Sequence, residues 1–274
     1  MTRLIMKPTT MLSLAALAAG LVSGADPATP KPGILVNPAV DTIVPQVVDG
    51  AGWSTSFFLT NLEPSKTIFW RLTFYSDGGG PMTLPLAGIG NANVVFASLP
   101  PNWSVAVDTA GAAAGLQQGW ATLATMDRSA DLPGATMVTD RIGGVGIFRQ
   151  RVSGRPDFEA VVPFSPVNEN KLVMPFDNRN GFSTGIAWLN PDFGFPAPLE
   201  VIIRDASGNL LRQDMFTLLG GAKLVFSMPD RYPEANLRHG RIQLSTPARL
   251  FSALGLRFNP TGAFTSFHAL SVAP

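Results

Sequence analysis

The sequence has no cysteine, only two histidines and few charged residues, and each scarcity excludes a class of chemistry. Without cysteine the chain cannot form a disulfide, a thiolate metal site, a cysteine nucleophile or the lipid-modified N-terminus of a bacterial lipoprotein. Charged residues make up 14% and the formal net charge is +1, so we expect no nucleic-acid partner. Apolar residues make up 46%, which is enough for a packed core.

The first 25 residues have the order of a secretory signal peptide. Arg3 and Lys7 supply positive charge, residues 11–22 are apolar, and residues 23–25 are small as at a cleavage site. A membrane anchor needs about 20 apolar residues, which is more than this run provides. We therefore predict a cleaved signal peptide at 1–25, export to the periplasm, cell surface or medium, and no transmembrane segment in the mature chain.

One motif occurs twice, and the two copies lie 129 positions apart. Residues 52–61 read Gly-Trp-Ser-Thr-Ser-Phe-Phe-Leu-Thr-Asn, and residues 181–190 read Gly-Phe-Ser-Thr-Gly-Ile-Ala-Trp-Leu-Asn. A repeat of this length indicates a duplicated domain rather than a solenoid of short units. We expect a proline-rich linker at 26–40, a first domain at 41–167 and a second domain at 171–274.

The apolar residues alternate as they do in half-buried strands. Ile68, Trp70, Leu72 and Phe74 share one face, and the second copy repeats the pattern at residues 199–203. The strands expected in the first domain are 54–61, 68–75, 94–99, 103–108, 119–126, 145–150 and 158–164. Those expected in the second domain are 185–190, 198–205, 210–219, 223–228, 241–245, 250–258 and 265–272.

About seven short strands in each unit predict an all-β chain of two tandem immunoglobulin-like β-sandwiches. No segment has a helical apolar stripe, and residues 110–116 can form at most one helical turn. The first domain alone has extra residues at 82–91 and 126–139. We expect both inserts to be loops, which could carry specificity or cover a sheet edge.

The repeated opening, G-[W/F]-S-T-x4-[T/L]-N, resembles that of the tandem immunoglobulin-like β-sandwich modules found in secreted bacterial surface proteins. The resemblance covers both predicted domains. It implies an exported location and a sandwich fold, and it names no active site.

Gly181–Gly185 matches the nucleophile elbow G-x-S-x-G, with Ser183 as the nucleophile. That motif works on a sharp turn from a strand into a helix, whereas Ser183 stands before a strand. The histidines suggest no catalytic triad either, because His239 lies in a predicted loop and His268 in the last predicted strand. We predict that the protein is not an enzyme and that Ser183 is part of a strand start.

Two isolated histidines do not make a zinc site, which takes three or four ligands. The segment 177–181, Asp-Asn-Arg-Asn-Gly, has some resemblance to a calcium loop but lacks the alternating ligands and the closing glutamate. Asp, Asn and Gly are also common turn residues. We predict a turn and no metal, while a single weak calcium site stays open at this loop.

The five tryptophans could form a platform for sugar rings. Trp70 and Trp188 lie inside predicted strands, where core packing is the expected role. Trp103 follows Pro100, Pro101 and Asn102, so it is the best candidate for an exposed stacking residue.

We therefore predict an exported, non-catalytic structural or adhesive module at the cell envelope or outside the cell, with no cofactor. Its partner would be an envelope or extracellular protein or polysaccharide. A carbohydrate-binding module is the second hypothesis and a secreted hydrolase the third. An enzyme should gather polar residues in one cleft and a glycan binder should expose coplanar aromatics, whereas a scaffold should do neither. The sequence does not identify the ligand-binding residues.

Overall fold

The structure, a computed structural model, describes residues 42–128, 135–166, 170–247 and 251–272. The predicted signal peptide, the proline-rich linker and the joint at 167–169 lie outside the described residues. Within the described ranges the chain is all-β, and its α-helical and 3-10 segments are short. No helix in these ranges is long and apolar enough to cross a membrane.

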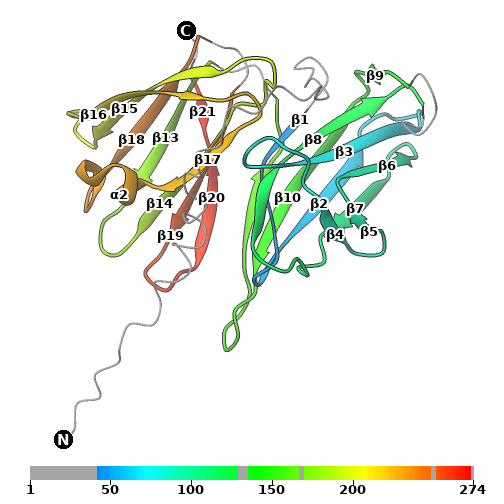
Figure 1. The fold of residues 1–274 in the computed structure, drawn as a ribbon, viewed down its shortest axis with the longest axis horizontal. Coiled ribbons are helices and arrows are strands. Elements are labelled where there is room, and N and C mark those ends of the chain that lie inside the picture. Colours follow the sequence, from blue (N-terminus) through cyan, green and yellow to red (C-terminus); the bar gives the residue numbers. More distant parts are fainter. Residues whose placement is uncertain (1–41, 129–134, 167–169, 248–250, 273–274) are drawn as a thin grey trace, which may run out of the picture.

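The N-terminal half, residues 42–166, and the C-terminal half, residues 171–271, are built of separate sets of strands (Figure 1). The strands of the N-terminal half are β1 (Thr42–Asp49), β2 (Trp53–Asn61), β3 (Ile68–Ser76), β4 (Leu84–Leu86), β5 (Gly90–Ala92), β6 (Val94–Leu99), β7 (Ser104–Asp108), β8 (Gln117–Met126), β9 (Met137–Val138), β10 (Ile142–Gln150), β11 (Phe158–Pro163) and β12 (Ser165–Pro166). The C-terminal half contains β13 (Lys171–Asp177), β14 (Ser183–Leu189), β15 (Ala197–Asp205), β16 (Leu210–Leu218), β17 (Lys223–Ser227), α2 (Met228–Arg231), the 3-10 helix η1 (Pro233–Ala235), β18 (His239–Ser245), β19 (Ser252–Phe258), β20 (Phe264–His268) and β21 (Leu270–Ser271).

Each half has two main antiparallel sheets, and the strand order is the same in both halves. In the N-terminal half, sheet A has the order β12-β1-β8-β3-β6, with β9 beside β8, and sheet B has the order β11-β10-β2-β7. In the C-terminal half, sheet D has the order β21-β13-β18-β15-β16 and sheet E the order β20-β19-β14-β17. Every strand of sheets D and E therefore has a counterpart in sheets A and B. Among the strands of the described residues, only β4 and β5, which form the small sheet C, and β9 lack a counterpart.

The cores follow from the alternation along the strands. Ile68, Trp70, Leu72 and Phe74 are all buried, as predicted, and they join a cluster contributed by both sheets A and B. Residues Leu199, Val201 and Ile203 do the same in the cluster of sheets D and E. Apolar residues that recur at every second position give each strand one apolar face. Burying that face away from water stabilises the folded state.

Most predicted strands are present, with ends shifted by a few residues, but the one expected at 265–272 is divided into β20 of sheet E and β21 of sheet D. The longer strands β1 and β13 were not predicted. Each contains a proline, Pro45 or Pro175, which argues against a central strand. Pro45 lies at a register shift between Val44 and Val47, and β21 pairs only with Leu172 and Val173, short of Pro175. Neither proline therefore has to donate a ladder hydrogen bond at its position.

Three further predictions are wrong. The insert at 82–91 is not a free loop, because it contributes the β4–β5 hairpin, whose Leu84 and Leu86 are buried in the core. The described part of the insert at 126–139 contains β9. His239 opens β18 instead of lying in a loop.

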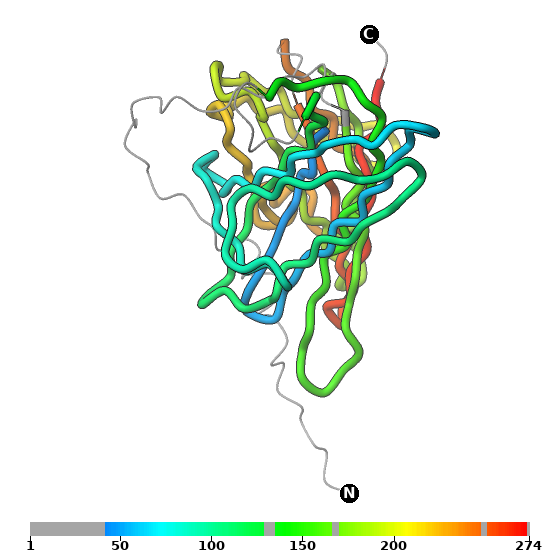
Figure 2. Tube along the Cα trace, turned by 90° about the vertical axis from the view of Figure 1, so that its right-hand side faces the viewer, coloured from blue at the N-terminus to red at the C-terminus, as the bar shows by residue number. Residues whose placement is uncertain are grey.

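The turn between β10 and β11 extends beyond the body of the N-terminal half (Figure 2). Arg149 and Glu159, on the two strands that lead into it, are joined by an ion pair at 2.6 Å.

Candidate binding surfaces and functional residues

The threonines of the repeated motif hold the same two hydrogen bonds in both halves. The Thr55 hydroxyl donates to the Val48 carbonyl oxygen and accepts from the Val48 amide. The Thr184 hydroxyl makes the same pair of bonds with Asp177. Ala51 and Asn180, in the turns between these residues, have φ values of 52° and 53°. The threonine therefore closes the turn between two strands and has a structural role.

The asparagine at the end of the motif is also structural. Asn61 donates through Nδ2 to the carbonyl oxygens of Leu99 and Pro100, and Asn190 does so to those of Leu218 and Leu219. Both asparagines are buried, so these bonds satisfy polar groups that water does not reach. The threonine and asparagine of the motif therefore connect neighbouring strands.

Ser183 lies at the start of β14, as predicted, and its hydroxyl pairs with that of Ser227 at 3.4 Å. Neither histidine appears among its hydrogen-bond partners. His268 lines a cavity of about 140 Å³ together with the buried Ser252, and Ser183 is not part of its lining. No aspartate or glutamate lines that cavity among the described residues, so the third member of a triad is missing there.

At the loop that was weighed as a calcium site, the Asp177 carboxylate pairs with two arginine side chains of the chain. Asp177 accepts from Arg179 Nε at 2.9 Å and from Arg257 Nη2 at 2.8 Å, and Arg257 lies over the Phe182 ring. The Arg179 guanidinium, assisted by Arg257, holds the pKa of Asp177 well below its usual range, although burial opposes this. In the described ranges no three side chains of His, Cys, Asp or Glu gather into a possible metal site.

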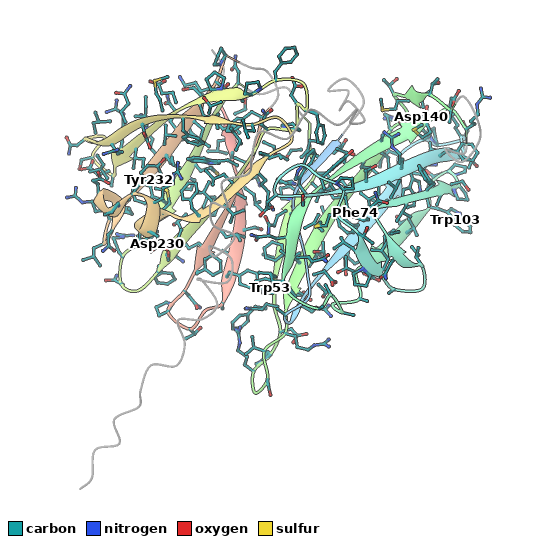
Figure 3. The ribbon with its side chains drawn as sticks, in the orientation of Figure 1. Trp53, Phe74, Trp103, Asp140, Asp230 and Tyr232 are labelled. Carbon is teal, nitrogen blue, oxygen red and sulfur yellow. The ribbon has the colours of Figure 1, made fainter. Side chains whose placement is uncertain are left out.

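The tryptophans divide into four buried residues and one exposed residue. Trp70 and Trp188 are buried, as the sequence indicates, and so are Trp53 and Trp120. Trp103 is 63% exposed, also as predicted, and it follows Asn102, whose φ is 62°. Figure 3 shows Trp103 at the end of the N-terminal half that is remote from the C-terminal half. It is therefore available to a partner.

An apolar surface that sequence reasoning missed covers the outer side of sheet B. We define the sheet B face as Phe58, Ala106, Val145, Ile147 and Val161. The strand register places Phe58 between Ala106 and Val145, and Ile147 opposite Val161. Phe58 is 44% exposed, and Val145 and Val161 are also exposed. Leu62 and Trp103 lie beyond one end of this face, past the hydrogen-bonded hydroxyls of Thr60 and Ser104.

The two halves meet at an interface that sequence reasoning also missed. We call this interface, where Lys223 and Phe193 of the C-terminal half contact the N-terminal half, the seam. Lys223 is buried there, and its Nζ contacts Asp77 Oδ1 at 2.9 Å, Gln46 Oε1 at 2.7 Å and the Gly119 carbonyl oxygen at 2.5 Å. Burial lowers the pKa of the Lys223 ammonium, and attraction to Asp77 opposes that change. The sequence around Lys223 does not indicate that this lysine is buried in an ion pair, because its partners are far away in the chain.

Aromatic rings complete the seam. Phe193 of the C-terminal half packs on Tyr75 and Trp120, which stack on each other with centroids 4.4 Å apart. The Trp120 Nε1–H donates to the Gly221 carbonyl oxygen at 3.1 Å. Gly79 lies so close that a Cβ there would come within 2.8 Å of the same oxygen. The seam is therefore closely packed as well as hydrogen-bonded.

The comparisons with known proteins identify no family. No protein-family model matches the chain, and a comparison with curated proteins finds no match. Among solved structures, the chain is similar to the M60 catalytic domain with the CBM51-1 and CBM51-2 domains from Clostridium perfringens ZmpB, at 10% sequence identity and a TM-score of 0.16. The alignment covers 74% of this chain but only 31% of that one. A likeness at that score carries no argument about function.

Proposed function

We propose that the protein is an exported, non-catalytic module with a structural or adhesive role at the cell envelope or outside the cell. Its two halves would be duplicated immunoglobulin-like β-sandwich domains, at 41–167 and 171–274, that follow a signal peptide cleaved after residue 25. The identical strand order of the two halves and their matching threonine and asparagine bonds support the duplication. The charge and apolar order of residues 1–25 supports export.

The observation that carries the proposal is the sheet B face. Phe58, Val145 and Val161 are exposed side by side on a regular sheet, with Trp103 and Leu62 at its end. Large contiguous apolar patches on soluble proteins mark interaction sites. A paired sheet also loses little backbone entropy on binding, because its backbone is already ordered.

Capture of partners from envelope fractions tests this role. The purified chain should retain envelope proteins or polysaccharides, and Phe58→Glu should abolish retention. Phe96→Glu is a matched control, because Phe96 is also 44% exposed but lies on β6 of sheet A. If Phe58→Glu and the unaltered chain retain the same material, the sheet B face is not the binding surface.

The absence of catalysis remains part of the proposal. Pairing of the Ser183 hydroxyl with Ser227 supports a structural role for this serine. If the purified protein has any esterase activity, Ser183→Ala should leave that activity intact. Loss of the activity with the fold preserved would favour the hydrolase hypothesis.

Carbohydrate binding is the second candidate, and the exposure of Trp103 favours it specifically. An exposed indole can stack on the apolar face of a sugar ring. A glycan screen with the unaltered chain and with Trp103→Ala separates the two candidates. Glycan binding that depends on Trp103 but not on Phe58 would replace the adhesive role with a lectin-like one.

A further inference from the structure

The sheet B face has a counterpart in the C-terminal half, and that counterpart is already an interface. Ala187, Leu254, Leu256 and Phe258 of sheet E belong to the apolar cluster of the N-terminal half. Phe264, on the adjacent β20, stacks on Trp53 and Phe148 of the N-terminal half, with centroids 5.4 Å and 5.3 Å away. The C-terminal half therefore uses the outer side of sheet E to pack on the half that precedes it.

The strand register identifies the equivalent positions. Ala187 lies between Val225 and Leu254, and Phe58 lies between Ala106 and Val145 at the same place in the same strand order. Ala187 is buried at 6% exposure, whereas Phe58 is 44% exposed. The same surface is thus covered in one half and open in the other.

The loops at the end of each sheet correspond as well. The Asn190 amide donates to the Ala222 carbonyl oxygen, as the Asn61 amide does to that of Trp103. Gly221 precedes Ala222 and Asn102 precedes Trp103, with φ values of 72° and 62°. In the C-terminal half this loop contacts Trp120 across the seam. In the N-terminal half the same loop points away from the molecule and carries Trp103 (Figure 3).

A matching receiving surface is open on the C-terminal half. Tyr75 and Trp120, which receive Phe193, lie opposite each other on β3 and β8. Their counterparts on β15 and β18 are Arg204 and Arg241, also directly opposite each other, and Arg241 is exposed. Like charges directly opposite each other on a sheet are destabilising. Guanidinium groups are good partners for an exposed indole such as that of Trp103.

The positions that correspond to the Lys223–Asp77 ion pair carry no charge. Lys223 follows Ala222 as Ser104 follows Trp103, and Asp77 follows Ser76 as Ala206 follows Asp205. The ion pair of the seam is therefore replaced by an uncharged serine and alanine. These two positions would bring no buried charge into a contact between the equivalent surfaces.

We propose that the sheet B face of one molecule packs on the C-terminal half of a second copy, head to tail, as the C-terminal half packs on the N-terminal half within the chain. Trp103 then lies against Arg204 and Arg241 of the next copy. The contact is heterologous, so it extends into chains of molecules instead of closing into a symmetric dimer. This inference deepens the proposed adhesive or structural function, on which it rests, by naming the partner as the protein itself.

Sedimentation velocity of the purified chain at increasing concentration tests the proposal. The unaltered chain and the control Phe96→Glu should form species heavier than the monomer that grow with concentration. Phe58→Glu alters only the sheet B face, and Arg241→Glu alters only the receiving surface at Arg204 and Arg241. Each variant alone should therefore stay monomeric. Their equimolar mixture should form a dimer and nothing larger, because one intact surface of each kind remains. If Phe58→Glu fails to fold, Trp103→Ala provides a second variant on the same side of the contact as the sheet B face.

Three outcomes would overturn the inference. The unaltered chain could stay monomeric at every concentration. Arg241→Glu could associate as well as the unaltered chain, which would mean a symmetric dimer through the sheet B face. The mixture of variants could fail to dimerise although each variant is folded. Envelope capture by a strictly monomeric chain would retain the proposed function and refute only self-association.

Discussion

Buried hydroxyl and amide side chains secure the strand connections in both halves. Thr55 and Thr184 each bridge the amide and carbonyl of one residue on the preceding strand. Asn61 and Asn190 donate to consecutive carbonyl oxygens at the ends of β6 and β16. Because these groups are buried, each bond also prevents an unpaired polar group in the core. These bonds explain the threonine and the asparagine of the repeated motif.

We expect Thr55→Val and Thr184→Val each to lower the free energy of unfolding by about 1–3 kcal/mol, because a buried amide loses its acceptor. Thr265→Val, at an exposed strand position, serves as the control and should change it little. Urea unfolding followed by tryptophan fluorescence measures the difference. Equal midpoints for all three variants would show that the threonine bonds do not stabilise the fold.

Acid should remove the stabilisation that Asp177 provides. Its pKa is lowered in the folded state from an ordinary value of 3.8, so the carboxylate stabilises the fold above that value. The contribution is lost as the pH falls below 3.8 towards the folded-state pKa. The stability difference between the unaltered chain and Asp177→Asn should therefore be constant near neutral pH and shrink in strong acid. A difference that is independent of pH would contradict the role of the charge.

At the scale of elements, the β4–β5 hairpin has no counterpart in the C-terminal half and is part of the core of the N-terminal half. Met82, Leu84 and Leu86 are buried, while Ile89 at the turn between the two strands is 54% exposed. The Leu86–Thr109 bridge and the bond from the Ala110 amide to the Pro85 carbonyl fix the hairpin beside the end of β7. Shortening this insert would therefore damage the fold and would not isolate a binding loop.

We expect Leu84→Ala to destabilise the protein by about 2–5 kcal/mol, because it leaves a cavity in a packed core. Ile89→Ala should have an effect near zero. Thermal unfolding of both variants measures the contrast. Similar melting temperatures for the two variants would show that the hairpin is not part of the core.

At the scale of the whole molecule, the seam combines an apolar sheet face, stacked aromatic rings and one buried ion pair. The Lys223 ammonium has oxygen partners from three different strands or turns of the N-terminal half, so its position is strongly specified. A buried charge with good partners adds specificity of packing rather than much net stability. Removing one member is costly, because the other is left behind.

Lys223→Met should cost about 3 kcal/mol of unfolding free energy, since Asp77 loses its partner. The double variant Lys223→Met, Asp77→Asn should cost less than the sum of the two single changes. A double-mutant cycle in urea measures this coupling. Strict additivity would mean that the ion pair contributes nothing to the seam.

The C-terminal half should fold alone but less stably than in the intact chain. Residues 171–274 contain a complete pair of sheets, so we expect a cooperative transition. Leu254, Leu256 and Phe264 would then be exposed, so the fragment should melt at a lower temperature and bind a hydrophobic dye. Calorimetry measures the transition. Its absence would mean that the two halves share one core.

Much of the fold could be predicted because strand formation depends on neighbouring residues. Alternation located β3 and β15 and identified Trp70 as a core residue, and the loop prolines indicated that Trp103 is exposed. Pro45 and Pro175 concealed β1 and β13, because a proline is tolerated in a strand only where no ladder bond is needed. That condition depends on the register with other strands and is not visible locally.

The sequence by itself determined the all-β class, the strand pattern of each half and the lack of cysteine chemistry, since these depend on composition and on residues close in the chain. Only the tertiary structure decided which sheet faces are covered. Phe58 and Ala187 occupy corresponding positions, yet the larger and more apolar side chain is the exposed one. Burial at these positions depends on which distant surface packs against the sheet, and no local pattern encodes that choice.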